Sequence, residues 1–190
     1  GIGKEVFLIG FLGRFMAQKG FRYLVDAIDL LRREGDLPRR PLVLAFGEGA
    51  YIREEKQAIK ERSLQDHFIF MPFTPNVAGT IKGLDVVVMP SLWEACGLLA
   101  MEVLTCGTPL IGSDCIGLRE VLKGTPSKII PKGNSLRLAK ELEAEIRINN
   151  KNLFLEYKKQ AKKRFNVNNL KKEIEILYER LLAEKKKIEN

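Results

Sequence analysis

Two glutamates, Glu94 and Glu102, stand eight positions apart in the stretch SLWEACGLLAMEVLTCGTPLIGSD, which covers residues 91–114. On one continuous helix their side chains would be separated by about 12 Å along the axis, too far apart for a close carboxylate pair. If the helix begins instead near Gly97, Glu94 lies in the preceding loop and Glu102 lies about one turn inside the helix. Both carboxylates can then face the helix N-terminus, which is a natural anion-binding site.

A helix that begins at Gly97 could bind a phosphorylated sugar. Glycine lets the backbone come close to a phosphate, and the free N–H groups of Gly97, Leu98 and Leu99 would point toward it. Glu94 could accept hydrogen bonds from sugar hydroxyls on one side of that phosphate, and Glu102 from a ribose on the other, because a carboxylate matches a vicinal diol. Taken singly, either glutamate could equally be an ordinary surface residue.

The stretch GFLGRFMAQKGF places two cations after an apolar run. Gly13 allows a close backbone turn, and Arg14 and Lys19 stand before the next predicted helix. The planar fork of arginine grips phosphate at two points and lysine supplies a compact charge, so together they would suit a diphosphate. The alternative is that both are solvated surface charges.

A second glycine pair occurs in AFGEGAY, where Glu48 stands between Gly47 and Gly49. The pair lacks the third glycine of the dinucleotide-binding fingerprint, and the chain contains no Walker sequence. A tight turn and a ligand-facing loop both fit this pattern.

Apolar runs alternate with amphipathic segments along the chain. The runs are apolar throughout rather than at every second position, which is typical of parallel strands covered on both faces. We therefore predict an α/β fold with a Rossmann-like, doubly wound parallel sheet and C-terminal helices, whose ligands bind beyond the carboxyl ends of the strands. The predicted strands cover residues 5–13, 41–47, 67–71, 85–90, 108–114 and 127–131. The predicted helices cover residues 19–34, 51–63, 76–84, the segment after Gly97, 117–122, 135–149, 152–163 and a long segment from 168.

The composition is that of one folded domain. The chain has 190 residues, of which 45% are hydrophobic, and it contains neither a signal peptide nor an apolar run of about 18 residues that could span a membrane. We expect a cytoplasmic protein, with the inner face of the membrane as a further possibility. Because the sequence begins Gly-Ile-Gly without Met, we also expect a piece of a longer polypeptide.

The net charge of +8 is concentrated at the C-terminal end, where residues 151–190 carry twelve Lys or Arg against six Asp or Glu. Solvated helix faces explain this excess, and attraction to an anionic membrane or an acidic partner is the alternative. No aromatic-interleaved basic stripe favours nucleic acid.

The three cysteines and the single histidine, His67, lack the spacing of a zinc site. Cys106 and Cys115 are predicted to be small buried residues.

Taken together, these motifs resemble the C-terminal half of the family-4 (group 1) retaining glycosyltransferases of GT-B architecture. The resemblance rests on GRFMAQKG, FGEG, LDVVVMPSLWEACGLLAMEVLTCGTPLIGSD, GLREVL and IIPKGNSLRLAKEL, in that order, and covers nearly the whole chain. Glu94 and Glu102 match the family's E-x7-E pair. Residues 1–190 would then be the nucleotide-sugar (donor) binding domain, and the N-terminal acceptor domain of a full GT-B enzyme is absent from this chain.

The resemblance also implies roles for individual residues. Arg14, Lys19 and Glu94 would act in catalysis, with Glu94 on the donor sugar, Glu102 on the ribose and the two cations on the diphosphate. Backbone groups of Phe70 or Met71 would contact the base. Ala95 and Cys96 replace the family's usual Gly-Phe, and Met71-Pro72 stand where the family usually has a glycine. The implied donor-binding residues are Gly13, Gly47, Glu48, Phe70, Met71, Ala95, Cys96, Gly97, Leu98, Leu99 and Glu102.

The implied reaction is metal-independent transfer of a hexose from a UDP-, GDP- or ADP-sugar, with retention and without a cofactor, and the chain has no D-x-D motif. The acceptor would be a saccharide or a lipid-linked molecule in polysaccharide, lipopolysaccharide or glycolipid biosynthesis. This fragment alone is expected to be inactive. The alternatives are a glycogen- or starch-synthase-like or phosphorolytic GT-B enzyme, and a non-catalytic module that binds nucleotides or polyanions.

Overall fold

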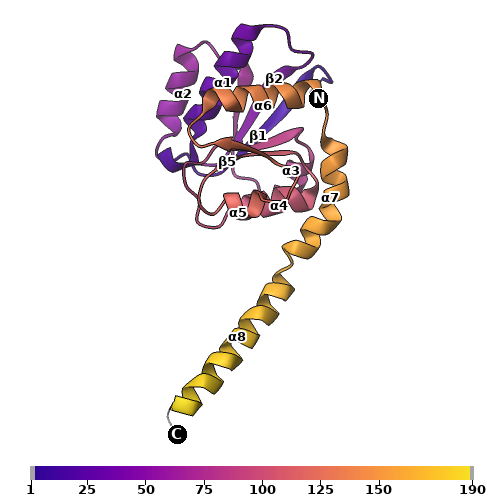
Figure 1. Cartoon of the computed structure of the whole chain (residues 1–190). Helices are drawn as coiled ribbons and strands as arrows, with labels where there is room; N and C mark the ends of the chain where they lie inside the picture. The colour runs from indigo at the N-terminus through magenta and orange to yellow at the C-terminus, as the bar shows by residue number, and fades with distance from the viewer. Residues whose placement is uncertain (1–2, 189–190) are drawn as a thin grey trace.

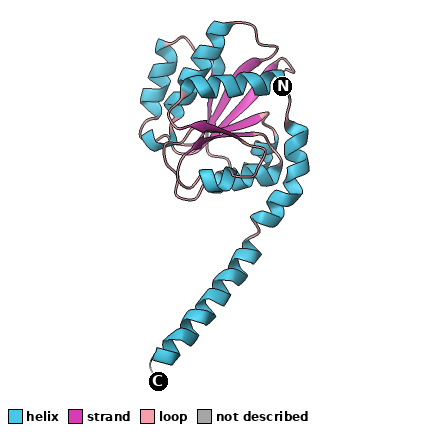
Figure 2. Cartoon of the chain, viewed as in Figure 1, coloured by secondary structure: helices cyan, strands magenta, loops and turns pink. Residues whose placement is uncertain are grey.

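The computed structural model describes residues 3–188 and contains one six-stranded sheet in which every neighbouring pair of strands is parallel. The strand order is β3-β2-β1-β4-β5-β6, and the predicted doubly wound sheet is confirmed (Figure 2). The central strands are buried on both faces, as their apolar sequences require. The strands are β1 (Val6–Leu12), β2 (Arg40–Phe46), β3 (Phe68–Met71), β4 (Val86–Met89), β5 (Leu110–Asp114) and β6 (Lys128–Pro131).

Helices cover both faces of the sheet, and each face has its own apolar core (Figure 1). On one face lie α1 (Phe21–Glu34), α2 (Ile52–Glu61) and α6 (Ser135–Arg147). On the other lie α3 (Val77–Lys82), α4 (Leu98–Cys106), α5 (Arg119–Leu122) and α7 (Lys151–Arg164), and α7 packs against α4. Two short 3-10 helices, η1 (Ala17–Lys19) and η2 (Gln65–His67), precede α1 and β3.

The strand order reverses between β1 and β4, which are neighbours in the sheet although 73 residues separate the end of one from the start of the other. Successive connections leave this point toward opposite faces, so the loops after the two strands diverge and leave a hollow at the carboxyl edge. The loop after β1 carries Arg14 and Lys19, and the loop after β4 carries Glu94. The topology thus brings the predicted residues to one edge.

The last helix, α8 (Val167–Ile188), continues from α7 and projects away from the body of the domain (Figure 1). Its large apolar side chains are exposed where the structure describes them. Leu170, Ile174, Leu177 and Leu181 are each at least 43% accessible and recur at helical spacing.

Candidate functional site

A pocket of about 960 Å³ opens at the carboxyl edge of the sheet, between the loops that follow β1, β2, β3 and β4. A volume of this size is at the upper end of the range typical of small-molecule sites. It brings together all the residues predicted to bind the donor except Phe70 and Met71. The lining residues from the prediction are Gly13, Arg14, Lys19, Gly47, Glu48, Glu94, Ala95, Cys96, Gly97, Leu98, Leu99 and Glu102.

The helix start at one wall of the pocket decides between the two arrangements open for the glutamates. α4 begins at Leu98 and its N-cap residue is Gly97, so Glu94 lies in the loop and Glu102 inside the helix. Gly97 has a φ of 64°, and a Cβ there would lie 2.9 Å from the carbonyl oxygen of Gly117. No described side chain caps this helix end. Its first N–H groups are therefore available to an anion in the pocket.

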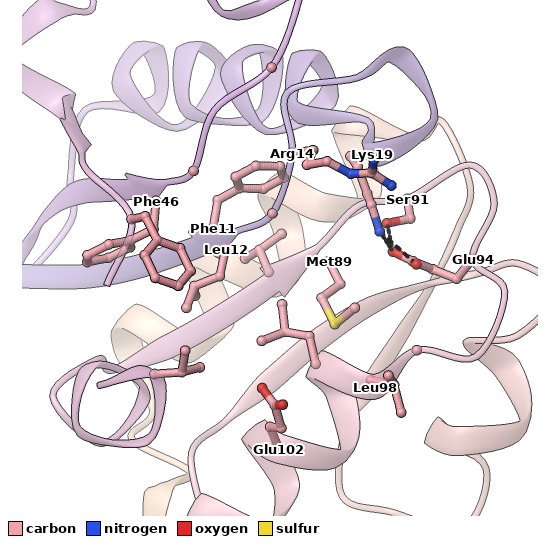
Figure 3. A pocket seen from close by; sticks show the side chains of 18 of the residues that line it. Phe11, Leu12, Arg14, Lys19, Phe46, Met89, Ser91, Glu94, Leu98 and Glu102 are labelled. Atoms are coloured by element: carbon pink, nitrogen blue, oxygen red, sulfur yellow. Dashed lines mark hydrogen bonds and ion pairs between the residues drawn. The ribbon is translucent and has the colours of Figure 1, made fainter. Parts of the chain in front are cut away.

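Glu94 is nearly buried and is held by two partners (Figure 3). Both of its carboxylate oxygens accept hydrogen bonds of 2.8 Å from Lys19 Nζ, and Oε1 also accepts one of 2.7 Å from the hydroxyl of Ser91. The Lys19–Glu94 contact joins the loop after β1 to the loop after β4, 75 residues apart. The lysine predicted for the diphosphate is thus the counter-ion of the carboxylate predicted for the sugar.

Arg14 and Glu102 lie at the pocket with their charges unpaired. Arg14 is exposed beside Lys19, whereas Glu102 projects from α4 at a distance from that group (Figure 3). Among residues 3–188, no hydrogen bond or ion pair engages either side-chain charge, so both remain available to a ligand.

The first two glycine loops support each other through their backbones. Gly13 N–H donates to the carbonyl of Phe46, and Phe15 N–H donates to the carbonyl of Glu48. A Cβ on Gly47 would lie 2.1 Å from the Gly13 carbonyl oxygen, and φ at Gly47 is 130°. The G-x-G pair is therefore a tight turn that also faces the pocket, so the two readings of its sequence are compatible.

Within the described chain, Phe70 and Met71 are not among the residues that line the pocket. The ring of Phe70 packs against Phe15 at 5.5 Å between ring centroids, and Lys56 Nζ lies 4.9 Å from the Phe70 centroid. The lining residues of this region are Phe73 and Thr74, in the loop after β3, and Phe73 is 74% exposed. Base contact by Phe70 or Met71 stays a prediction.

The cysteines divide by position. Cys106 and Cys115 are buried as predicted, and burial raises the pKa of both thiols, so they remain protonated at neutral pH. Cys96 is exposed and lines the pocket immediately before the start of α4. Within residues 3–188, no three His, Cys, Asp or Glu side chains are arranged to hold a metal ion.

Ser91 is the site residue that the sequence analysis did not single out. It is the second residue after β4, is 2% exposed, and its hydroxyl donates to Glu94 three positions later. A serine just after a buried strand and three residues before a candidate carboxylate is the signal that could have indicated it, because serine hydroxyls commonly bond to nearby groups in turns.

Comparison with known proteins agrees with this geometry. The family model for glycosyl transferases group 1 matches residues 1–164, so the chain belongs to the group 1 glycosyltransferase family. One similar curated protein is a 2-deoxystreptamine glucosyltransferase of Streptomyces kanamyceticus, which is 34% identical over 139 residues, 72% of this chain and 35% of the relative. The chain spans about a third of the length of the curated relatives it matches.

Solved structures share the fold. Anabaena HepE, crystallised in complex with UDP and glucose, superimposes with a TM-score of 0.83 at 22% identity over 92% of this chain and 48% of that chain. The C-terminal domain of the group 1 protein LpcC from Francisella tularensis gives a TM-score of 0.72 at 20% identity, over 84% of this chain and 85% of that domain. The fold is the Rossmann-like α/β domain of GT-B glycosyltransferases. No helix within the described residues combines the length and hydrophobicity needed to cross a membrane.

Proposed function

We propose that this chain is the donor-binding domain of a retaining, metal-independent hexosyltransferase whose donor is a UDP-, GDP- or ADP-sugar. The observation that carries the proposal is the convergence of two cations, two carboxylates and an uncapped helix N-terminus on one pocket. Cations and helix N–H groups are complementary to a diphosphate, and carboxylates to the hydroxyls of the sugars on either side of it. Complexes of the similar HepE with UDP and glucose support the same ligand class.

The chemistry requires stabilisation of the leaving nucleoside diphosphate. When the glycosidic bond to the phosphate breaks, negative charge grows on the phosphate oxygens. Arg14, Lys19 and the first N–H groups of α4 supply positive charge at that point without a metal ion. Glu94 holds the hydroxyls of the sugar that is transferred, and Glu102 holds the ribose.

The acceptor is assigned to a second domain of the same polypeptide. The exposed apolar face of α8, formed by Leu170, Ile174, Leu177 and Leu181, is a surface for that domain to cover. The pathway we infer is synthesis of a polysaccharide, a lipopolysaccharide or a glycolipid.

Calorimetric titration tests the proposal. UDP, GDP and ADP are each compared with the corresponding sugar nucleotide, UDP-glucose, GDP-mannose and ADP-glucose, at low and at high salt. We expect one nucleoside diphosphate to bind in preference to the others, and this chain alone to transfer no sugar. Equal binding of all three diphosphates, lost together as salt rises, would instead identify a general polyanion binder.

A further inference from the structure

Ser91 lies where the ends of β4 and β5 meet the pocket. It is the second residue after β4, and its hydroxyl donates to Glu94 Oε1 at 2.7 Å. The hydroxyl of Ser113, on the neighbouring β5, donates in turn to the carbonyl of Ser91. Ser91 and Ser113 are 2% and 1% exposed, so the sheet itself fixes this short polar chain.

The two partners of Glu94 differ in what a ligand can do to them. Lys19 lies at the end of η1 with 22% of its side chain accessible, so a diphosphate in the pocket can compete for its ammonium group. Ser91 is almost inaccessible and its hydroxyl proton is already directed at Glu94. A ligand can therefore remove the first partner but not the second.

Loss of Lys19 to a phosphate would leave Glu94, which is 8% exposed, without its counter-ion. A nearly buried carboxylate without a partner is costly, and it lowers that cost by rotating toward water. In the described chain, the Ser91 hydroxyl is the remaining side-chain group bonded to Glu94 and can oppose this rotation.

We propose that Ser91 is a positioning residue that keeps the Glu94 carboxylate directed at the donor sugar after the diphosphate has taken Lys19. The inference rests on the proposed function, because it assigns the sugar to Glu94 and the diphosphate to Lys19. It adds a residue that touches neither part of the donor and acts through Glu94.

The test measures the sugar increment, defined as the dissociation constant of the nucleoside diphosphate divided by that of its sugar nucleotide. The probes are UDP with UDP-glucose, GDP with GDP-mannose, and ADP with ADP-glucose, and the pair that the unchanged chain binds is used for the variants. Ser91→Ala is expected to lower the increment about tenfold, the effect of one lost hydrogen bond to a charged group. Binding of the bare diphosphate should stay within about twofold, because the Ser91 hydroxyl is hydrogen-bonded to Glu94 and, within the described chain, to neither Arg14 nor Lys19.

Two further variants separate positioning from a loss of stability. Thr108→Val removes an equally buried hydroxyl, bonded at 3.1 Å to the carbonyl of Ile81 away from the pocket, and should leave the increment unchanged. Ser91→Cys keeps the shape of the side chain with a somewhat larger atom but weakens the donor, so it provides the measurement if Ser91→Ala does not fold.

A double mutant gives the decisive comparison. If Ser91 acts through Glu94, Ser91→Ala should change the increment little when Glu94→Ala is already present, because the Ser91 hydroxyl then has no side chain to position. A tenfold loss that persists in the Glu94→Ala background, or an unchanged increment in both folded Ser91 variants, overturns the positioning role. If the unchanged chain binds none of the three pairs, the proposed function and this inference fall together; if it binds a pair and the Ser91 variants match it, only this inference falls.

Discussion

At the scale of single residues, the central feature is that Lys19 and Glu94 form an ion pair with each other. Lys19 Nζ is 2.8 Å from both oxygens of a carboxylate that is nearly buried. The two residues therefore cannot contribute independently to binding, because a ligand group that attracts one of them weakens its ion pair with the other. Arg14, whose charge is unpaired in the described chain, is the cation that a phosphate can reach at no such cost.

Replacement of Glu94 should therefore affect the two parts of the donor in opposite directions. Glu94→Gln removes the negative charge that competes for Lys19, so we expect the affinity for a bare nucleoside diphosphate to rise by about 0.5–1 kcal/mol. The additional affinity from the sugar should fall, because an amide oxygen is a weaker acceptor than a carboxylate. Calorimetry with a diphosphate and its sugar nucleotide measures both effects. A Glu94→Gln variant that binds the bare diphosphate more weakly would contradict the assignment of Glu94 to the sugar.

Glu102 should behave differently because the structure shows no internal partner for its carboxylate within the described residues. If Glu102 accepts hydrogen bonds from the ribose, Glu102→Ala should weaken the diphosphate and the sugar nucleotide equally, by roughly 1–3 kcal/mol. Glu61→Ala, an exposed glutamate at the end of α2, is the matched control and should change neither affinity. If Glu102→Ala lost affinity for the sugar nucleotide only, Glu102 would have to be assigned to the sugar and not to the ribose.

The residue scale is also where sequence reasoning reached its limit. The types and spacing of Arg14, Lys19, Glu94 and Glu102 indicated a shared site, and the pocket contains all four. The bond between Lys19 and Glu94 was not predictable, because two groups that both attract a ligand can also attract each other, and only their distance decides. Ser91 was missed for a related reason: its spacing from Glu94 permits a hydrogen bond, but the side-chain rotamer decides whether the bond forms.

At the scale of elements, the beginning of α4 forms one wall of the pocket, and we propose that its N–H groups bind the diphosphate. Gly97 combines a left-handed φ of 64° with close approach to the Gly117 carbonyl. Gly97→Ala should therefore lower the free energy of unfolding by more than the ~1 kcal/mol that the conformation alone costs, and should also weaken diphosphate binding. Chemical denaturation and calorimetry measure the two effects.

Gly124 provides the matched control for this prediction. It has a similar φ of 73°, but no described heavy atom lies within 4 Å of the position of an added Cβ. Gly124→Ala should cost ~1 kcal/mol of stability and leave binding unchanged. Equal losses of stability and of binding in the two variants would show that the close approach at Gly97 has no special importance.

The junction of α6 and α7 contains a buried carboxylate that should respond to pH. Glu145 is 3% exposed, its described hydrogen-bond partner is Asn150 at 3.0 Å, and burial raises its pKa. A raised carboxyl pKa means that the folded chain favours the protonated form of Glu145. The stability that this protonation adds to the fold is complete below the ordinary pKa of glutamate, and it is lost as the pH rises through the raised pKa.

Glu145→Gln should abolish the loss of stability at rising pH, because glutamine does not ionise, and it retains an acceptor for Asn150. We expect the variant to melt at a higher temperature than the unchanged chain at neutral pH, and the difference to shrink in acid. Melting curves across this pH range provide the measurement. A variant that is less stable at neutral pH would show that the ionised carboxylate makes a net favourable contribution.

The elements themselves were largely predictable. Strands such as Val86–Met89 are apolar at every position because both faces of the sheet are covered, and that property distinguishes parallel strands in a sequence. The helix start at Gly97 was one of two readings, and the left-handed turn decided it. The part of the pocket near β3 was not predicted in detail. Phe70 packs against Phe15, whereas Phe73 and Thr74, in the loop after β3, line the pocket.

At the scale of the whole molecule, α8 adds apolar surface that the domain itself does not use. Replacement of Leu170, Ile174, Leu177 and Leu181 by serine should leave the free energy of unfolding of the sheet domain within about 0.5 kcal/mol, because these side chains are exposed. Denaturation followed by a signal from Trp93, which lies outside α8, tests this. A large loss of stability would mean that α8 packs on this domain in solution.

The arrangement of the pocket bears on the proposal that this chain is a donor-binding domain. The pocket is built from loops at one edge of one sheet, and every residue that we propose for the diphosphate, the ribose and the sugar belongs to this domain. We therefore expect the chain alone to bind the donor.

The measurement that tests this account most directly compares a nucleoside diphosphate with its nucleoside on the unchanged chain and on Arg14→Ala, with Arg180→Ala on the remote α8 as the control. We predict that the unchanged chain binds the diphosphate much more tightly than the nucleoside, and that Arg14→Ala weakens the diphosphate by ~1.5–3 kcal/mol while the nucleoside and the control are unaffected. Equal affinity for diphosphate and nucleoside, or equal losses for both ligands in Arg14→Ala, would contradict the assignment of this pocket to a nucleotide diphosphate.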